Sequence, residues 1–202
     1  MNKMAYELHL GDCIEVMRGM PDGSVDAAIC DPPYGMKKAE WDNDLINPKL
    51  WLPNCRNIAS RTAVFVGVRG IYDYPKPEWV ISWTRSGSTQ RNGKLRGFNN
   101  WEPILLYDVE RLSNDVIRAP NYPDKGTEGH PTPKPLKVIK LLIERLTKPG
   151  DTIIDPFMGS GTTGVACMME GRRFIGIEIC KEYYDISEKR IYEASLQPRL
   201  IP

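Results

Sequence analysis

Residues 152–164 read Thr-Ile-Ile-Asp-Pro-Phe-Met-Gly-Ser-Gly-Thr-Thr-Gly and lead from a short apolar run into a stretch of helical composition. The glycines at 159, 161 and 164 form a G-x-G-x-x-G pattern, which is typical of nucleotide-binding loops when it lies between a strand and a helix. The next apolar run places Glu178 about 20 residues after the first glycine, where an acidic side chain accepts hydrogen bonds from ribose hydroxyls. The loop contains no lysine, which excludes a P-loop.

Short apolar or β-branched runs recur along the chain and predict strands at 4–10, 25–30, 63–68, 79–83, 101–107, 152–155 and 174–179. Several of these runs are continuously apolar, as in strands buried on both faces of a parallel sheet. The strands at 79–83 and 101–107 are joined by a turn-rich stretch with Asn92-Gly93 near its middle, which predicts an antiparallel hairpin with a long loop. Helices are predicted at 134–147, 162–170 and 181–194.

The position of the glycine loop in the chain predicts the order of the fold. After Gly164 the sequence has room for a helix, a strand and a helix, which do not complete a nucleotide-binding sheet. We therefore expect residues 1–107 to supply the missing strands. The prediction is an α/β fold, namely a doubly wound, Rossmann-like, seven-stranded, mostly parallel sheet with one antiparallel hairpin, circularly permuted. Residues 1–202 form one domain in this prediction, with a catalytic half at 1–107, a connector and minimal target-recognition region at 108–133, and a cofactor-binding half at 134–202.

Composition excludes several classes of protein. The 202 residues carry 27 Lys and Arg against 26 Asp and Glu, so the net charge of +1 excludes a uniformly basic nucleic-acid coat. The longest apolar run is far shorter than the roughly 20 residues that span a bilayer, and residues 1–10 lack the apolar core of a signal peptide. The 5 cysteines form no C-x-x-C pair, and with 2 histidines they offer no zinc-ligand spacing. We expect a reduced protein of the cytoplasm of a bacterial or phage-infected cell, with no membrane or metal.

A second motif, Asp31-Pro32-Pro33-Tyr34, follows the predicted strand 25–30. Consecutive prolines have fixed φ and no N–H donors, so they hold the neighbouring carboxylate, carbonyl and aromatic ring in a stiff array. The Asp31 carboxylate and the Pro32 carbonyl can accept both N–H bonds of an exocyclic amino group, while the Tyr34 ring stacks on the base. This array fits adenine or cytosine. In a parallel sheet it lies at the same edge as the glycine loop.

With these motifs the sequence resembles the amino-directed DNA methyltransferases of the permuted beta group, which methylate adenine N6 or cytosine N4. The resembling stretches are 31–34, 130–135 (His-Pro-Thr-Pro-Lys-Pro) and 155–163, and they occur in the group's own order. The resemblance covers most of the chain and implies S-adenosylmethionine as cofactor and double-stranded DNA as partner. Aspartate at position 31 favours adenine, because the cytosine enzymes more often have serine there.

The resemblance also implies where the cofactor binds. Its methionine part is expected against the glycine loop, at Asp155, Pro156, Phe157, Gly159, Ser160, Gly161, Thr162 and Thr163. Glu178 is expected to bind the ribose hydroxyls, and Asp12 with Cys13 the adenine edge. The His-Pro segment is expected to close over the methionine end through His130, Thr132 and Lys134. The group commonly has glutamine where Pro133 stands here.

The motif suggests a mechanism for the reaction. The amino nitrogen of adenine is a poor nucleophile because its lone pair is delocalised into the ring. By accepting both amino protons, Asp31 and the Pro32 carbonyl favour a pyramidal nitrogen whose lone pair attacks the methyl group in line. The amino group is inaccessible inside a duplex, so the base is expected to flip out and stack on Tyr34. Neither a metal nor a covalent nucleophile is required.

The same sequence suggests a DNA-contacting element. Basic residues outnumber acidic ones between Arg56 and Arg96. The hairpin loop contains cations suited to phosphate and base-edge contacts, namely Arg85, Arg91, Lys94 and Arg96. A solvated hairpin loop would carry the same residues. Because the recognition region is minimal, the target site is short, or specificity depends on a homodimer or another partner such as a restriction enzyme.

Other functions stay open at this point. An NAD-dependent enzyme would use the glycine loop and Glu178, but it would leave residues 31–34 without a role. Related RNA or amide methyltransferases usually carry the glycine loop before the Pro-Pro motif, whereas here it follows. A cytosine-N4 methyltransferase would share the mechanism. A catalytically idle DNA-binding or cofactor-binding regulator of the same fold is disfavoured by the intact motifs.

Overall fold

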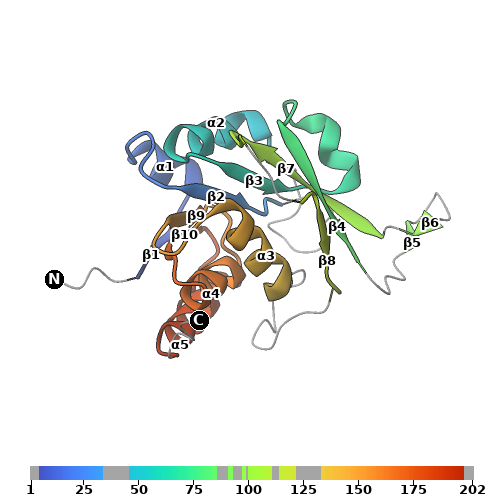
Figure 1. The fold of residues 1–202 in the computed structure, drawn as a ribbon. Coiled ribbons are helices and arrows are strands. Elements are labelled where there is room, and N and C mark those ends of the chain that lie inside the picture. Colours follow the sequence, from blue (N-terminus) through green and yellow to red (C-terminus); the bar gives the residue numbers. More distant parts are fainter. Residues whose placement is uncertain are drawn as a thin grey trace.

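The chain folds around one eight-stranded sheet in the order β1-β10-β9-β2-β3-β7-β4-β8 (Figure 1). The computed structural model describes residues 5–33, 46–85, 91–92, 97–98, 100–110, 114–121 and 133–197. The sheet strands are β1 (Tyr6–Leu10), β2 (Ala27–Cys30), β3 (Thr62–Phe65), β4 (Trp79–Thr84), β7 (Trp101–Tyr107), β8 (Val116–Arg118), β9 (Thr152–Asp155) and β10 (Arg173–Glu178). A separate antiparallel pair, β5 (Arg91–Asn92) and β6 (Gly97–Phe98), lies beyond the ends of β4 and β7.

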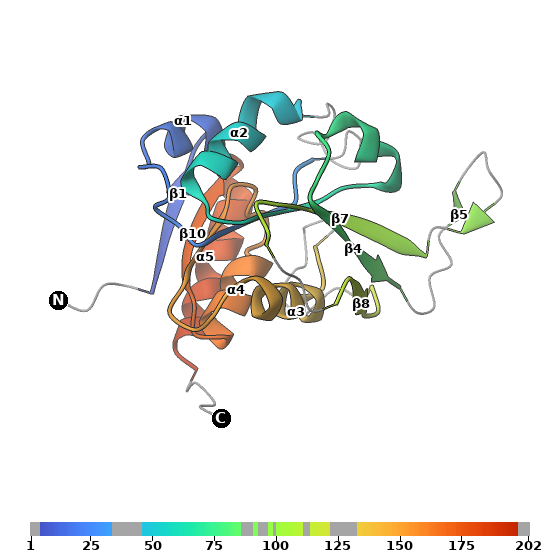
Figure 2. The same ribbon diagram turned by 45° about the horizontal axis from the view of Figure 1, so that its top comes forward.

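Helices cover both faces of the sheet (Figures 1 and 2). They are α1 (Cys13–Arg18), α2 (Pro48–Ile58), α3 (Leu136–Leu146), α4 (Thr162–Met169), α5 (Lys181–Ser195) and a 3₁₀ helix (Val68–Asp73). The first two α-helices lie on one face and the last three on the other. Alternate residues of β3 follow this division, because Val64 packs toward α2 while Ala63 and Phe65 pack toward α3. None of the described helices is long and apolar enough to span a membrane.

The strand pairing confirms the predicted permutation. The late strand β9 lies at the centre, parallel to β10 on one side and to β2 on the other. β1 pairs with β10 and β2 with β3, both in parallel. Within this sheet β7 alone is antiparallel to its neighbours, and it forms the predicted hairpin with β4. The helices that follow β9 and β2 lie on opposite faces, so a topological switch point falls between these two strands.

All seven predicted strands are present, and six elements were not predicted, namely α1, α2, the 3₁₀ helix, β5, β6 and β8. The short strand β8 lies in the expected connector and adds an eighth strand by pairing with β4. α1 and α2 were also missed. Asn47 caps α2 by accepting the Lys49 N–H at 3.0 Å, and Pro48 occupies the first turn, where a missing N–H is tolerated. Pro53 lies on the exposed side of this helix. Because proline usually ends a helix, its presence hid the apolar periodicity of 48–58 in the sequence.

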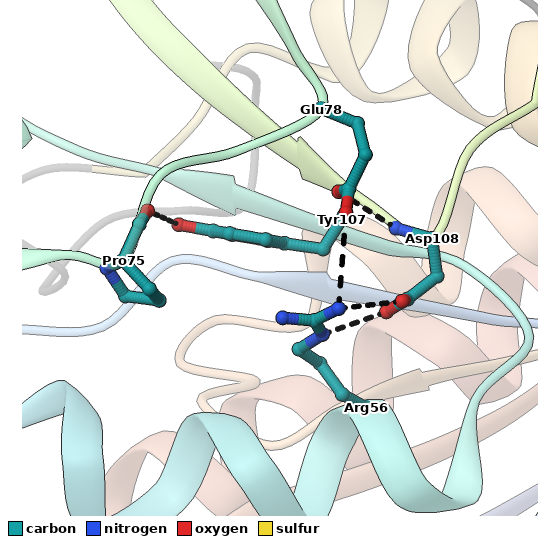
Figure 3. Close-up of polar contacts among 5 residues, drawn as sticks. All are labelled: Arg56, Pro75, Glu78, Tyr107 and Asp108. Carbon is teal, nitrogen blue, oxygen red and sulfur yellow. Dashed lines mark hydrogen bonds and ion pairs between the residues drawn. The ribbon is translucent and has the colours of Figure 1, made fainter.

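An arginine of α2 clamps that helix to the end of β7 (Figure 3). Arg56 donates from Nε and Nη2 to the two carboxylate oxygens of Asp108, at 2.8 and 2.6 Å, and lies over the Tyr107 ring. Glu78 lies 3.9 Å from the same guanidinium, and the Tyr107 hydroxyl donates to the Pro75 carbonyl at 2.9 Å. Because β7 is antiparallel, this clamp lies at the edge opposite the carboxyl ends of the parallel strands. The charge of Arg56 is thus neutralised in a structural contact.

Candidate active site

Carboxylates from four strands meet at the switch-point edge. Asp31 follows β2, Asp155 ends β9 and Glu178 ends β10, while Asp12 follows β1. The ends of β1 and β10 are held together by a hydrogen bond from the Gly11 N–H to the Glu178 carbonyl at 2.9 Å. The structure therefore brings together at one edge the acidic residues that the sequence singled out, although they come from opposite ends of the chain.

The glycine loop joins β9 to α4, and two of its glycines require a left-handed backbone. Gly159 has φ +52° and Gly161 has φ +80°. A Cβ atom on Gly161 would lie 2.8 Å from Ser187 Cβ, and one on Gly164 would lie 2.4 Å from Ile191 Cδ1. Both neighbours belong to α5. The glycines therefore allow the first turn of α4 to approach α5 closely.

The Asp155 carboxylate is buried beneath this loop. Its Oδ1 accepts the Phe157 N–H at 3.0 Å, and its Oδ2 accepts the Thr163 hydroxyl at 2.6 Å. Burial raises the pKa of Asp155 from 3.8 to about 7, although both hydrogen bonds favour the ionised form. The nearby charges of Asp31 and Glu178 raise this pKa further. Asp155 thus titrates close to neutral pH within the site.

We expect the raised pKa of Asp155 to make stability depend on pH. The folded protein holds a proton on this carboxyl between pH 3.8 and about 7, whereas the unfolded chain does not. Its contribution to the free energy of unfolding is therefore full below this window and declines as the pH rises through it. Asp155→Asn removes the titration and keeps an acceptor oxygen. Denaturant unfolding of both proteins across the window should show the variant gaining stability relative to the wild type as pH rises, and a constant difference would contradict the assignment.

Two of the other three carboxylates at this edge, Glu178 and Asp12, already bind backbone groups. Glu178 accepts the N–H groups of Gly159 and Cys180, each at 2.8 Å, and burial raises the pKa of Glu178. It therefore fixes the glycine loop onto the end of β10. Asp12 caps α1, since its Oδ1 accepts the Ile14 N–H at 2.7 Å. A carboxylate can accept about four hydrogen bonds, so these contacts leave capacity for ligand hydroxyls.

The catalytic motif meets the His-Pro segment through an ion pair. Lys134 Nζ donates to Asp31 Oδ1 at 2.6 Å and lies 3.4 Å from Glu102 Oε1. The sequence placed Lys134 at the methionine end of the cofactor, whereas its ammonium here lies on the carboxylate predicted to act on the base. Pro32 is buried, and Pro33 is partly buried beside it. Predicted residues Tyr34, His130 and Thr132 lie outside the described residues.

The geometry does not support the predicted phosphate contact of Arg85. The Arg85 guanidinium pairs with the Glu102 carboxylate, lies 4.7 Å from the centre of the Trp83 ring, and its side chain is only 8% exposed. We therefore remove Arg85 from the expected DNA-binding residues, because a buried and paired guanidinium has little access to phosphates. The side chain of Arg91, together with Lys94 and Arg96, lies outside the described residues.

Aromatic residues and unpartnered polar atoms complete the walls near the loop. Trp51 of α2 contacts Phe157 edge to face, with ring centroids 4.9 Å apart, and packs against Tyr74 in the same way. The sequence analysis missed Trp51 because α2 was not recognised. Thr162 Oγ1 is buried and has no hydrogen-bond partner among the described residues. Pro156 and Ser160 are also buried in the loop. Burial raises the pKa of Cys13 in α1 to about 12, so the Cys13 side chain is a neutral thiol.

Comparison with known proteins identifies the family. A family model described as DNA methylase, of the N6/N4 methyltransferase type, matches residues 76–189. The chain belongs to the N6/N4 DNA methylase family. The match includes the hairpin, the glycine loop and Glu178 of this DNA methylase, whereas residues 31–34 lie outside it, nearer the N-terminus.

Curated relatives agree with this assignment. The DNA methylase is 27% identical to the type II methyltransferase M.HinfI of Haemophilus influenzae, over 93% of this chain and 68% of that protein. It is 26% identical to the type II methyltransferase M2.MboI of Moraxella bovis, over 93% of this chain and 88% of that protein. These relatives support the predicted connection to DNA methylation and restriction-modification.

Solved structures confirm the predicted fold class. The M1.HpyAVI–SAM complex superposes with a TM-score of 0.69 at 26% identity, over 92% of the DNA methylase and 99% of that chain. The cytosine-N4-specific PvuII DNA methyltransferase also gives a TM-score of 0.69, over 98% of the DNA methylase and 90% of that chain. At 18% identity the second match establishes the shared fold alone.

Proposed function

We propose that this DNA methylase transfers a methyl group from S-adenosylmethionine to the N6 amino group of an adenine flipped out of double-stranded DNA. The observation that carries the proposal is the placement of Asp31 next to the glycine loop at the switch point, where its charge acts on Asp155. An amino-group acceptor and a nucleotide-binding loop therefore share one edge of the sheet. The aspartate at position 31 supports adenine over cytosine, as the resemblance to the beta group implies.

The residues at this edge fit the cofactor. The glycine loop begins at the end of β9 beside Glu178, and the buried Thr162 hydroxyl offers a hydrogen bond that no described residue takes up. Glu178 has acceptor capacity for ribose hydroxyls, and Asp12 with Cys13 lies beside it for the adenine edge. S-adenosylmethionine supplies an electrophilic methyl group when bound. We assign cofactor binding to residues 155–163 of the loop, to Glu178 and to the end of β1.

Asp31 and the Pro32 carbonyl make the amino nitrogen of the target base more nucleophilic. The Asp31 carboxylate and the Pro32 carbonyl accept the two amino protons, which localises the nitrogen lone pair on the side facing away from these acceptors. Their rigid display on consecutive prolines keeps this geometry before the base arrives. Tyr34 stacks on the flipped base, which offsets part of the few kcal/mol lost on unstacking. The amino proton leaves after the methyl group is transferred.

DNA binding is assigned to the hairpin loop beyond β4 and β7. The pair formed by β5 and β6 extends past the sheet, so this loop reaches away from the core (Figure 2). We keep Arg91, Lys94 and Arg96 as phosphate or base contacts and residues 108–133 as the minimal recognition region. A homodimer would supply recognition surface that such a short region lacks.

Nucleoside mass spectrometry tests the proposal directly. Unmethylated DNA is incubated with the protein and S-adenosylmethionine, digested to nucleosides and compared with a reaction lacking the protein. We expect N6-methyldeoxyadenosine. N4-methyldeoxycytidine would overturn the adenine assignment and preserve the mechanism. A digest without either modified nucleoside, from protein that binds S-adenosylmethionine, would overturn methylation of DNA bases and favour the idle regulator.

A further inference from the structure

Four charged side chains of alternating sign form a continuous row behind the catalytic motif. Asp31 Oδ1 contacts Lys134 Nζ at 2.6 Å, and Lys134 Nζ lies 3.4 Å from Glu102 Oε1. The other oxygen of Glu102 contacts the Arg85 guanidinium. The four residues come from the ends of β2, β4 and β7 and from the segment before α3. Each ion pair of the row therefore joins two different elements of the fold.

The inner members of this row are desolvated, and both cations also face aromatic rings. The side chains of Lys134, Glu102 and Arg85 are 11%, 7% and 8% exposed. Lys134 Nζ lies 5.2 Å from the centre of the Phe65 ring, and the Arg85 guanidinium lies 4.7 Å from that of Trp83. Buried charges are tolerated when oppositely charged partners surround them. The position of the Lys134 ammonium is therefore fixed by two carboxylates and a ring.

The protonation of Lys134 agrees with this arrangement. Burial alone lowers the pKa of Lys134, but the carboxylates of Asp31 and Glu102 outweigh it and raise the pKa above its ordinary value. Lys134 is therefore a permanent cation that can orient the Asp31 carboxylate and cannot act as a base. Because the row contains two cations and two anions, the Lys134 charge is balanced without drawing on a ligand.

We propose that Glu102 and Lys134 are positioning residues for methyl transfer: Glu102 holds the Lys134 ammonium, which fixes the Asp31 carboxylate in the orientation that accepts the amino protons of the target base. This inference rests on the proposed function. It assigns a role to Glu102, which belongs to none of the sequence motifs, and it moves Lys134 from the cofactor to the target side of the site. A carboxylate free to rotate about its side-chain bonds would lose this alignment.

Neutral variants of similar shape distinguish a role of Lys134 in positioning Asp31 from a role in binding the cofactor. We expect Lys134→Met and Glu102→Gln each to lower kcat by about 10²-fold, the loss typical of a catalytic group displaced by about 1 Å. The Kd for S-adenosylmethionine, measured by calorimetry, should stay within about threefold of the wild type. A kcat close to that of the wild type, or a Kd raised tenfold with kcat restored at saturating cofactor, would overturn the proposal.

A double variant separates positioning from simple charge balance. If Glu102 only neutralises Arg85, then Arg85→Met combined with Glu102→Gln removes both charges and should restore kcat, which would overturn the proposal. If Glu102 holds Lys134, the double variant should remain as slow as Glu102→Gln alone. Circular dichroism and thermal midpoints show which variants fold, and Lys134→Arg, which keeps the cation, should recover part of the lost kcat.

A matched ion pair away from the site serves as the control. Lys140 of α3 contacts Glu170 at 2.7 Å, and neither residue belongs to the row or to a sequence motif. Lys140→Met and Glu170→Gln should leave kcat unchanged. The wild-type reaction distinguishes the positioning role from the proposed function, because wild-type protein that binds cofactor and fails to methylate DNA overturns the proposed function itself. Active wild type with a normal Lys134→Met variant overturns only the positioning role.

Discussion

Asp31→Asn should lower kcat by about 10³-fold, because it removes the negative charge that stabilises the developing positive charge on the amino nitrogen. The substitution preserves side-chain shape, so the motif keeps its backbone geometry. The asparagine amide can still accept one hydrogen bond, but it faces Lys134, whose ammonium lies 2.6 Å from the present carboxylate oxygen. The loss is therefore expected in the chemical step rather than in assembly of the site.

Two measurements distinguish this loss from misfolding. The Kd for S-adenosylmethionine should stay within about threefold of the wild type, because the predicted cofactor contacts lie on other strands, while single-turnover methylation slows by the full factor. Asp22→Asn, an exposed aspartate in the turn before β2, makes the same change of charge and should leave both quantities unaltered. Joint loss of cofactor affinity and turnover in Asp31→Asn would indicate a structural role for Asp31.

Gly161→Ala should destabilise the protein and abolish cofactor binding. A left-handed φ costs a non-glycine residue about 1–2 kcal/mol, and overpacking adds roughly 1–3 kcal/mol. At this position the new Cβ would lie 2.8 Å from Ser187 Cβ and 3.0 Å from Ser187 Cα, so the backbone of α5 has to shift. The combined loss of roughly 2–5 kcal/mol is large beside a typical domain stability of about 5–15 kcal/mol.

A variant at a second glycine separates the backbone strain from the steric clash. Gly150 has φ +89°, and a Cβ there would meet nothing within 4 Å, so Gly150→Ala carries backbone strain without a clash. We expect it to lose only about 1–2 kcal/mol in denaturant unfolding and to keep its affinity for S-adenosylmethionine. Equal losses for the two variants would show that contact between α4 and α5 does not constrain Gly161.

Much of the fold could be predicted because its signals are local. The apolar runs predicted every strand of the eight-stranded sheet except β8, which has three residues and lies in a polar segment. The glycine loop, placed late in the chain, predicted that β1 and β2 would complete the sheet. α2 was missed because Pro48 and Pro53 read as helix breakers, whereas one occupies the first turn and the other the exposed side.

The site was only partly predictable because its contacts join distant parts of the chain. Residues 31 and 155–163 were located by motifs that carry their own backbone geometry. Glu102 carries no motif, and its importance arises from meeting Lys134 and Arg85 across the sheet. The same convergence explains why the Arg85–Glu102 pair was not predicted, since a cation at the start of a loop gives no sign in the sequence that a carboxylate partner lies on the neighbouring strand of the sheet.

The central position of β9 has a consequence for synthesis of the protein. A ribosome makes β1, β2 and β3 first, yet β1 borders only β10, and one edge of β2 pairs with β9. Until β9 and β10 have emerged from the ribosome, β1 has no neighbour in the sheet and β2 presents an unpaired edge, the kind of edge that promotes association between chains. The nascent protein therefore needs β9 and β10 to close the sheet. We expect methylating activity only after these two strands have been made, so chains terminated before β9 should not modify DNA.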